Sequence, residues 1–444
     1  MSGEALHSVE AARAAILGAI AGPLAAETVG VDRALGRVLA AGVVAAVTLP
    51  PWDNSAMDGY AVLAADTAGA SEDSPVRLAI TGEVPAGGVA DVAVEHGSAI
   101  RIATGAPIPH GADAIVPVEQ TIPLDDAGKP GARGRDAVGP VPAAILVHVA
   151  GAPGAHIRRR GSDLSEGDAI LASGAVLSPA AIALAAGAGL SSVQVRRRPR
   201  VAVLATGNEV RAAGEDLGAA GIPDANGPGL RALVDASGAE PIDLGIAPDE
   251  LEDVVGRLRA ALEGGADAIV VAGGVSVGPY DVVKLAFESI GEIGLWRVAV
   301  QPGKPFAFGT AARPDGGRAL LFGLPGNPVS SFVTFELFVR PAIRALAGRL
   351  DVLRPVDRAV LLDEARTAPN RRAFLRVTAE RDPDGAPSRD AEGRVRVRLS
   401  RGPAGQGSHV LSALAAADAL AVVPEDVDTH RAGDAVELWW LDPP

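Results

Sequence analysis

Five loops rich in glycine and proline lie between residues 205 and 328, and their composition suits the binding of an anion. Glycine lets the backbone approach a ligand closely. Several of these loops run into a segment that predicts the start of a helix, where free N–H groups and the helix dipole favour negative charge. The five loops span residues 205–209, 245–249, 273–278, 301–305 and 323–328. One such loop alone would indicate a turn, but the set predicts a site for a phosphate-bearing ligand.

Four charged side chains accompany these loops: Glu209, Asp249, Asp281 and Lys304. Carboxylates near a phosphate repel it unless a divalent cation lies between them, and Mg²⁺ is usually held by one or two carboxylates together with substrate phosphates. The loops therefore indicate metal-assisted chemistry on a phosphate or nucleotide. For a single carboxylate a simpler role stays open, because Asp249 and Asp281 both stand where helices are predicted to begin and could stabilise a helix N-terminus.

Two further stretches combine turn-forming and polar residues far from these loops in the sequence. Residues 49–61 contain two prolines, Trp52, Asp53 and Asp58, and residues 101–107 place Thr104-Gly105 directly after a predicted strand. The first stretch could also be only a junction between domains, because proline and glycine commonly mark such turns.

The loops must be positioned by a regular framework, and the sequence from residue 201 onwards predicts one. The predicted strands span residues 201–204, 241–246, 268–272, 296–300, 306–309 and 319–322, and the predicted helices span 229–237, 250–262, 282–290 and 327–347. Such alternation indicates a mostly parallel sheet covered on both faces. Ligands of these sheets bind outside the carboxyl ends of the strands, so all five loops should face one crevice.

The rest of the chain shows other patterns. Residues 1–46 predict a helix, a loop and a second helical stretch around residues 33–39, and Ser178-Pro179 predicts the start of a short helix. Residues 50–149 are β-rich, with strand-like runs at 76–81, 98–102 and 114–118 and a loop or disordered insertion at 121–142. The basic run at 196–200 indicates a solvated linker. Five β-type runs after residue 353, at 359–362, 374–378, 395–399, 420–423 and 436–441, predict a terminal β-barrel or sandwich.

Composition excludes several classes of function. The chain of 444 residues is 48% apolar, carries a formal net charge of −14 and contains no cysteine. The acidic balance argues against a nucleic-acid or membrane partner, and the lack of cysteine excludes disulfides and thiolate chemistry. No histidine pair has the spacing of a zinc site. We expect a cytoplasmic location, because the uncharged residues 14–26 follow Glu4 and Glu10 rather than a basic start.

The loops resemble those of the MoeA family, the molybdopterin molybdenumtransferases, which includes the plant Cnx and gephyrin E domains. The resemblance rests on residues 50–60 (PPWDNSAMDGY), 104–107 (TGAP), 111–114 (GADA), 273–278 (GGVSVG), 302–305 (PGKP) and 323–328 (GLPGNP). These motifs follow the order of the family over nearly the whole chain.

The resemblance implies a multidomain α/β plus β protein. An elongated helical and β linker domain would be formed by residues 1–49 and 150–195, with a β-rich module over 50–149 inserted between them. Residues 196–349 would form a three-layer αβα adenylyltransferase-like domain with a mostly parallel sheet. Residues 350–444 would form a C-terminal β-barrel. It also implies a homodimer, with the active cleft between the α/β domain of one subunit and the β-rich module of the other.

The implied reaction is the insertion of molybdenum, in which adenylyl-molybdopterin and molybdate give molybdenum cofactor and AMP with the help of Mg²⁺. The upstream adenylyltransferase of the pathway is a candidate partner. By the resemblance, the catalytic residues are Asp58, Thr104, Glu209, Asp249 and Asp281, with Asp249 and Asp281 as metal ligands. The cofactor-binding residues are Gly273, Gly274, Ser276, Gly278, Lys304, Pro305, Pro325, Gly326, Asn327, Pro328, Arg371 and Ser408.

The sequence departs from the family pattern at three positions. Gln301 stands where several members carry a basic residue, Ala225 replaces a common serine, and Pro279 replaces a usual acidic residue, which leaves more of the metal-binding role to Asp281. Arg371 has Arg372 beside it, so either could face the anion. Two alternative functions fit the sequence less well. A molybdopterin adenylyltransferase would not need the β-rich module or the barrel. A purely structural scaffold would not need the acidic and lysine residues of the loops.

Overall fold

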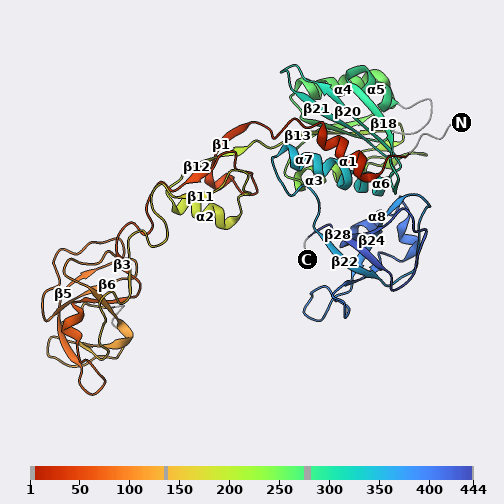
Figure 1. The fold of residues 1–444 in the computed structure, drawn as a ribbon. Helices are drawn as coiled ribbons and strands as arrows, with labels where there is room; N and C mark the ends of the chain where they lie inside the picture. Colours follow the sequence, from red (N-terminus) through yellow and green to blue (C-terminus); the bar gives the residue numbers. More distant parts are fainter. Residues whose placement is uncertain (1–5, 135–138, 275–281, 443–444) are drawn as a thin grey trace.

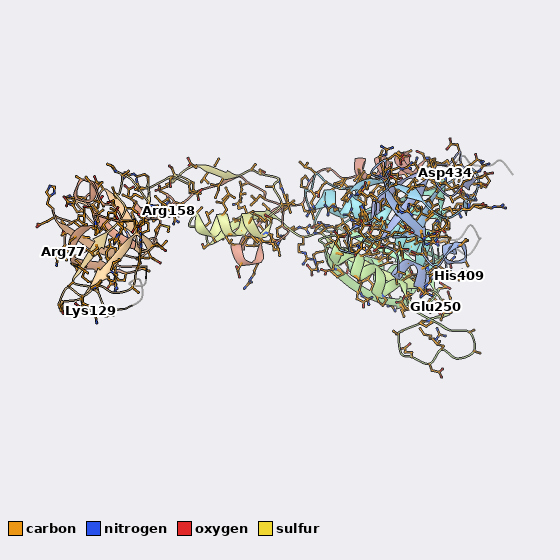
Figure 2. All side chains as sticks on the ribbon, turned by 90° about the horizontal axis from the view of Figure 1, so that it is seen from below. Arg77, Lys129, Arg158, Glu250, His409 and Asp434 are labelled. Atoms are coloured by element: carbon orange, nitrogen blue, oxygen red, sulfur yellow. The ribbon has the colours of Figure 1, made fainter. Side chains whose placement is uncertain are left out.

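The computed structural model describes residues 6–134, 139–274 and 282–442, and the molecule is elongated (Figure 1). The β-rich module lies at one end, the α/β domain and the C-terminal barrel lie together at the other, and a narrow segment of paired strands joins them. Figure 2 shows the same separation from below, with Arg158 on the side of the module and Glu250 and His409 at the opposite end. Within one chain, the module and the α/β domain therefore do not share a site. In the described ranges, no helix is both long and apolar enough to cross a membrane.

The α/β domain is built on a six-stranded sheet in the order β16-β13-β17-β21-β20-β18. The strands are β13 (Arg200–Thr206), β16 (Glu240–Ala247), β17 (Ala268–Ala272), β18 (Glu292–Arg297), β20 (Pro305–Ala312) and β21 (Arg318–Leu324). Strands β16, β13, β17 and β21 pair in parallel, and β20 runs antiparallel to both of its neighbours, β21 and β18. The prediction of a mostly parallel sheet is confirmed.

Helices cover both faces of this sheet. They are α3 (Asn226–Ala236), α4 (Leu251–Glu263), α5 (Val282–Ile290), α6 (Pro328–Thr334), the π-helical turn η4 (Phe335–Val339) and α7 (Arg340–Leu346). Alternate residues of β13 point to opposite layers, as strand geometry requires. Val201 and Val203 join the core under α3, α6 and α7, whereas Ala202 and Leu204 join the core under α4 and α5. The predicted three-layer αβα architecture is therefore correct.

One predicted strand of this domain is wrong. Residues 296–300 do not form a single strand, because β18 ends at Arg297, opposite the first residue of β20. Val300 and Gln301 instead form the short strand β19 (Val300–Gln301), which pairs with strand β24 of the barrel. The predicted helix over residues 327–347 is present as one helical run, with the π-helical turn in its middle.

The elongated segment consists of short antiparallel pairs from two distant parts of the chain. Strand β1 (Ala26–Gly30) pairs with β12 (Ser192–Arg196), and β2 (Val43–Val44) pairs with β11 (Ala169–Leu171) beside helix α2 (Pro179–Gly187). The Ser178 side chain caps α2 by accepting a hydrogen bond from the Ala181 amide at 3.2 Å, which confirms the predicted helix start. The first helix, α1 (Val9–Gly18), does not lie in this segment, because its buried face joins the core shared by the α/β domain and the barrel.

The second helical stretch predicted for residues 33–39 is wrong. Only the 3₁₀ turn η1 (Val31–Arg33) forms there, and Leu39 forms a β-bridge with Val195. Gly36 adopts a φ of +72°, a left-handed conformation that glycine permits and that no right-handed helix can contain. The apolar residues of this stretch therefore pack as an extended chain.

The β-rich module contains a six-stranded sheet in the order β7-β4-β6-β5-β9-β8. Its elements are β3 (Asn54–Ser55), β4 (Gly59–Val62), η2 (Ala64–Thr67), β5 (Val76–Val84), β6 (Ser98–Ile102), β7 (Ala114–Pro117), η3 (Val118–Gln120), β8 (Thr121–Leu124), β9 (Ala144–Val147) and β10 (Ile157–Arg158). The prediction of a loop from residue 121 is wrong at its start, because β8 pairs with β9. Pro123 donates no hydrogen bond, and an edge strand such as β8 tolerates it.

The C-terminal part is a closed barrel of five strands, as the five β-type runs predicted. These are β22 (Val356–Leu361), β24 (Arg372–Ala379), β25 (Val395–Leu399), β26 (Ala419–Val423) and β28 (Ala435–Trp440), and each pairs with two others. Smaller elements are β14 (Val210–Arg211), β15 (Ile222–Pro223), β23 (Ala365–Arg366), η5 (Pro403–Gln406), α8 (Leu411–Ala415) and β27 (Thr429–His430). Phe374, Leu420 and Trp439 of the barrel join the same core as α1 and α7.

A buried carboxylate holds the chain where it enters the α/β domain. The Asp267 side chain is 2% exposed and accepts hydrogen bonds from both terminal nitrogens of Arg197, at 2.7 and 2.6 Å, and from the Arg200 amide at 2.9 Å. Arg313 donates to it at 2.5 Å. The interpretation of residues 196–200 as a solvated linker is therefore wrong for Arg197.

These contacts also set the pKa of the Asp267 carboxyl. Burial alone would raise this pKa, but the hydrogen bonds from Arg197 and from the Arg200 amide outweigh it, so the pKa lies below its ordinary value. A carboxyl with a depressed pKa in the folded state stabilises the fold above its ordinary pKa, and this contribution is lost as the pH falls through the folded-state value.

We expect Asp267→Asn to lower the free energy of unfolding at pH 7 by about 3–5 kcal/mol, because it leaves a buried ion-pair network without its carboxylate. Urea unfolding would measure this difference, which should shrink in acid below the ordinary carboxyl pKa. Asp315→Asn is the matched control, because Asp315 is an exposed partner of the same Arg313 and its loss should change stability little. Equal effects of the two substitutions would contradict the assignment of Asp267 as the centre of the network.

Candidate active site

A cavity of about 700 Å³ lies at the carboxyl ends of β13, β17 and β21. Its lining comprises Ala205, Thr206, Gly207, Glu209, Val210, Ile222, Pro223, Asp224, Ala225, Asn226, Asp249, Ala272, Gly273, Gly274, Val282, Leu285, Gly326, Asn327 and Pro328. Seven residues that the resemblance implies for the site are brought together here: Glu209, Asp249, Gly273, Gly274, Gly326, Asn327 and Pro328. They come from the loops after four parallel strands, which end at one edge of the sheet.

Glycines form part of the floor of the cavity, and at Gly273 the backbone leaves no room for a side chain. Gly273 has a φ of +99°, and a Cβ atom on it would lie 2.5 Å from the Thr206 carbonyl oxygen. A Cβ atom on Gly326 would lie 3.7 Å from the Cα atom of Gly273. The loops after β13, β17 and β21 are therefore in close contact, and at these glycines a ligand can approach the backbone directly, while side chains line other parts of the cavity.

Asp249 ties two of the loops together. Its carboxylate accepts a hydrogen bond from the Asn208 amide at 3.3 Å, and the Asn208 side-chain oxygen accepts one from the Asp249 amide at 3.1 Å. Helix α4 begins at Leu251 with Glu250 at its N-cap position, so Asp249 stands directly before the helix N-terminus and makes these hydrogen bonds with Asn208. The contact places Asp249 beside the loop that carries Glu209.

Three polar residues of the cavity were not predicted as site residues. Asp224 accepts a hydrogen bond from the Gly227 amide at 2.8 Å and so caps the start of α3. Asn226 donates to the Gly326 carbonyl at 2.8 Å, and Thr206 is buried at the end of β13. The sequence contains a signal for Asp224, since an aspartate just before a helical pattern is typical of an N-cap. The contacts of Thr206 and Asn226 depend on pairing between distant strands.

The described lining of the cavity is acidic. It contains three carboxylates, of Glu209, Asp224 and Asp249, and it contains no lysine or arginine. Within the described ranges, no group of three histidine, aspartate or glutamate side chains is arranged to hold a metal ion. The described carboxylates of this cavity therefore do not by themselves form a complete set of metal ligands. Ser276, Gly278 and Asp281 lie outside the described residues.

The loop of residues 301–305, called the lysine loop because it contains Lys304, reaches the same edge of the sheet for a reason that was not predicted. It precedes β20 instead of following a parallel strand, and because β20 is antiparallel to β21, its first residues lie near the carboxyl end of β21. Gly303, with a φ of +109°, packs against Thr334 of α6, where a Cβ atom would lie 2.5 Å from a methyl carbon. Lys304, Pro305 and Pro325 do not line the cavity.

Lys304, Arg371 and Ser408 belong to the junction between the α/β domain and the barrel. Val300 of β19 pairs with Arg372 of β24, and the Gln301 side chain accepts a hydrogen bond from the Ala368 amide at 2.6 Å. These contacts bring the lysine loop next to the start of β24. The Ser408 carbonyl accepts a hydrogen bond from the Val329 amide at 3.3 Å, close to the start of α6.

The two adjacent arginines of this junction differ in their contacts. Arg372 forms ion pairs with Glu10 and, at 3.1 Å, with Glu425. Arg371 forms no ion pair with any described residue. Arg372 is therefore occupied in holding α1 against the barrel, which leaves Arg371 as the better candidate for an anion.

Asp58 and Thr104 meet each other in the β-rich module. The Asp58 carboxylate accepts hydrogen bonds from the Thr104 amide at 2.7 Å and from the Thr104 hydroxyl at 2.9 Å. Both residues are exposed, and neither lines the cavity of the α/β domain. The pair therefore forms a polar site on the exposed surface of the β-rich module.

Comparison with known proteins gives a consistent result over the whole chain. The model of the MoeA N-terminal region (domain I and II) matches residues 7–189, a probable molybdopterin binding domain matches 202–345, and the MoeA C-terminal region (domain IV) matches 358–441. Molybdopterin molybdenumtransferase 2 of Mycobacterium tuberculosis is 38% identical over 427 residues, which is 93% of this chain and 95% of the relative. Molybdopterin molybdenumtransferase of Haemophilus influenzae is 32% identical over 438 residues, 97% of this chain and 98% of the relative.

Among solved structures, the molybdopterin biosynthesis moeA protein of Pyrococcus horikoshii is similar over 98% of this chain and 100% of its own. The two share 28% sequence identity with a TM-score of 0.73.

We expect Gly273→Ala to destabilise the protein by about 1–3 kcal/mol, the usual cost of forcing extra volume into a packed site, and to weaken nucleotide binding in the cavity. Urea unfolding and a titration with AMP would measure the two effects. Gly256→Ala is the matched control, because Gly256 lies within α4 with open space around it, and alanine there should raise helix stability. If both variants behave alike, the close backbone contact does not shape the cavity.

Proposed function

Because the chain belongs to the MoeA family of molybdopterin molybdenumtransferases, we propose that it is the transferase that inserts molybdenum into molybdopterin. Its substrates would be adenylyl-molybdopterin and molybdate, and its products molybdenum cofactor and AMP. The observation that carries this proposal is the cavity at the carboxyl edge of the α/β sheet, with its glycine floor and the carboxylates of Glu209 and Asp249. Its volume of about 700 Å³ lies in the usual range for small-molecule and cofactor sites.

The residues present fit a substrate-assisted Mg²⁺ site. Mg²⁺ is typically held by one or two carboxylates plus substrate phosphates, and the described cavity offers Glu209 and Asp249 without a complete set of protein ligands. Asp249 and Asp281 are our proposed ligands. When bound with the substrate, the ion would neutralise charge on the phosphates. The carboxylates would hold it at the cavity, and the glycine backbone would exclude water from beneath the ligand.

Molybdate would bind at the junction with the barrel. Lys304 and Arg371 can donate charge-assisted hydrogen bonds to an oxyanion, and Ser408 adds a hydroxyl. The cations of this junction would then bind the oxyanion, and the carboxylates of the cavity would bind the metal ion on the phosphates.

We further propose that the catalytic cleft is shared between two copies of the chain. The β-rich module, which carries Asp58 and Thr104, lies at the opposite end of the molecule from the α/β domain that contains the cavity (Figure 1), so these residues would act on the same substrate only from another subunit. In a symmetric dimer, each module would close the cavity of the partner, and the two sites would be equivalent.

The proposal predicts that the purified protein releases AMP from adenylyl-molybdopterin when molybdate and Mg²⁺ are present. Glu209→Gln and Asp281→Asn should each lower this release by about 100-fold or more, the usual loss when a catalytic carboxylate is removed. Chelation of the metal should stop it. Glu252→Gln is the control, because Glu252 is an exposed carboxylate of α4 outside the cavity. Normal release by both the Glu209→Gln and the Asp281→Asn variants would disprove the catalytic assignment.

The shared cleft predicts recovery of activity when two inactive variants are mixed. Asp58→Ala and Glu209→Gln protomers should each be inactive alone. After exchange, heterodimers carry one intact site, so a random mixture should recover about one quarter of the wild-type activity. A site built within one chain would give no recovery, even after native mass spectrometry has established that heterodimers have formed.

A further inference from the structure

We propose that Trp52 of one subunit stacks on a flat, fused heteroaromatic ring of the substrate that is bound in the cavity of the other subunit. This role rests on the proposed function, in which two copies of the chain share the cleft. The ring is the adenine or the pterin of adenylyl-molybdopterin, which have the same stacking chemistry. Trp52 would bind the ring, while the carboxylates of the cavity hold the metal ion on the phosphates.

Trp52 is an exposed tryptophan that its surroundings hold in place. It is 47% exposed, whereas Trp439 and Trp440 of the barrel are 7% and 5% exposed. Its indole N–H donates a hydrogen bond to the Gly105 carbonyl at 3.4 Å, and its own carbonyl accepts one from the Asn54 side chain at 3.3 Å. Tryptophan combines a large apolar area with one hydrogen-bond donor, which suits it to binding surfaces. The anchored residue therefore keeps nearly half of its surface for a further contact.

Trp52 lies next to the pair formed by Asp58 and Thr104. Gly105, which accepts the indole hydrogen bond, follows Thr104 directly in the chain. The Gly105 amide donates to the Ser55 carbonyl at 2.8 Å, so the segments that carry Asp58 and Thr104 are joined at this point. A substrate that reaches this pair therefore also comes within reach of the indole.

The cavity of the α/β domain offers no stacking partner in its described lining, which contains no aromatic side chain. Two apolar residues of this lining, Ile222 and Leu285, are 52% and 46% exposed, so part of the cavity wall is aliphatic and open to solvent. A flat ring against this wall would keep its second face in water. An indole from the other subunit would cover that face, which removes apolar area of both rings from water and adds the stacking interaction.

A purely structural role of Trp52 predicts a different outcome. The adjacent Asp53 carboxylate accepts hydrogen bonds from the Arg159 side chain and from the Arg160 amide, both at 2.7 Å, and so holds the junction with the elongated segment without the indole. If Trp52 only packed over this junction, its loss would lower the melting temperature or weaken every ligand of the cleft alike, whether or not the ligand has a ring.

The experiment compares Trp52→Leu with Trp52→Phe in calorimetric titrations of the whole protein with Mg²⁺ present. Leucine is apolar without a ring, whereas phenylalanine keeps a smaller aromatic ring. The ligands are AMP, 6-carboxypterin and ribose 5-phosphate, of which the last has a phosphate but no fused ring. Val89→Ala is the control, because Val89 is a 70% exposed apolar residue of the same module in a different loop.

In Trp52→Leu we expect the Kd of AMP or of 6-carboxypterin to rise about tenfold, the size expected when a base loses an aromatic stacking partner. The ligand that is weakened identifies the ring that stacks. Phenylalanine should restore most of the affinity. The Kd of ribose 5-phosphate and the melting temperature should stay unchanged, as should every value in Val89→Ala. If leucine lowers the melting temperature, Trp52→Met makes the same comparison.

Purified heterodimers test whether the indole acts on the cavity of the other subunit. A Glu209→Gln chain paired with a Trp52→Leu chain keeps one complete site, formed by the unaltered cavity of one chain and the unaltered module of the other. Its KM for adenylyl-molybdopterin should therefore equal the wild-type value. With both substitutions in one chain and a wild-type chain opposite, the intact cavity faces the altered module, and KM should rise about tenfold.

Equal weakening of AMP, 6-carboxypterin and ribose 5-phosphate would overturn the proposal, as would unchanged binding of both ring ligands in Trp52→Leu or a phenylalanine variant no better than leucine. Equal KM values in the two heterodimers would overturn the assignment to the other subunit. If the wild-type protein releases no AMP with molybdate, the proposed function fails, and the titrations alone then decide whether Trp52 binds a ring.

Discussion

The parallel pairing of β13, β17 and β21 constrains the rest of the site. Neighbouring strands lie about 4.8 Å apart, so the loops after them must pass each other at backbone distance. Gly273 meets this demand with a φ of +99° and a position where a side chain would strike Thr206. The same pairing sends alternate strand residues into two cores, so helices must cover both faces. The open edge is then the place left for a ligand.

Charge is distributed unevenly around this edge. The described cavity carries carboxylates, while Lys304 and Arg371 lie at the junction with the barrel. For the proposed substrates, electrostatic attraction would orient the ligand, because metal-bound phosphates would suit the acidic cavity and an oxyanion would suit the basic junction. Arg197 and Arg372 have a different function, since Arg197 binds Asp267 where the chain enters the α/β domain and Arg372 binds Glu10 of α1.

Local patterns predicted most of the fold, because strand and helix periods depend on residues near each other in the sequence. The strands and helices of the α/β domain and the five barrel strands follow these patterns closely. The errors come from long-range contacts. Arg197 looked solvated until Asp267, from 70 residues further along the chain, was placed beside it. The lysine loop reaches the site through an antiparallel strand, and Asn226 does so through a contact with Gly326.

The chain enters and leaves the β-rich module at neighbouring points. Leu49 and Leu164 form an antiparallel bridge, and the Leu49 amide donates to the Leu164 carbonyl at 2.8 Å. A short turn could span this gap, because closing a short loop costs little entropy. The two connections of the module therefore lie side by side, so a change in the length of the module would leave the register of the elongated segment unaltered.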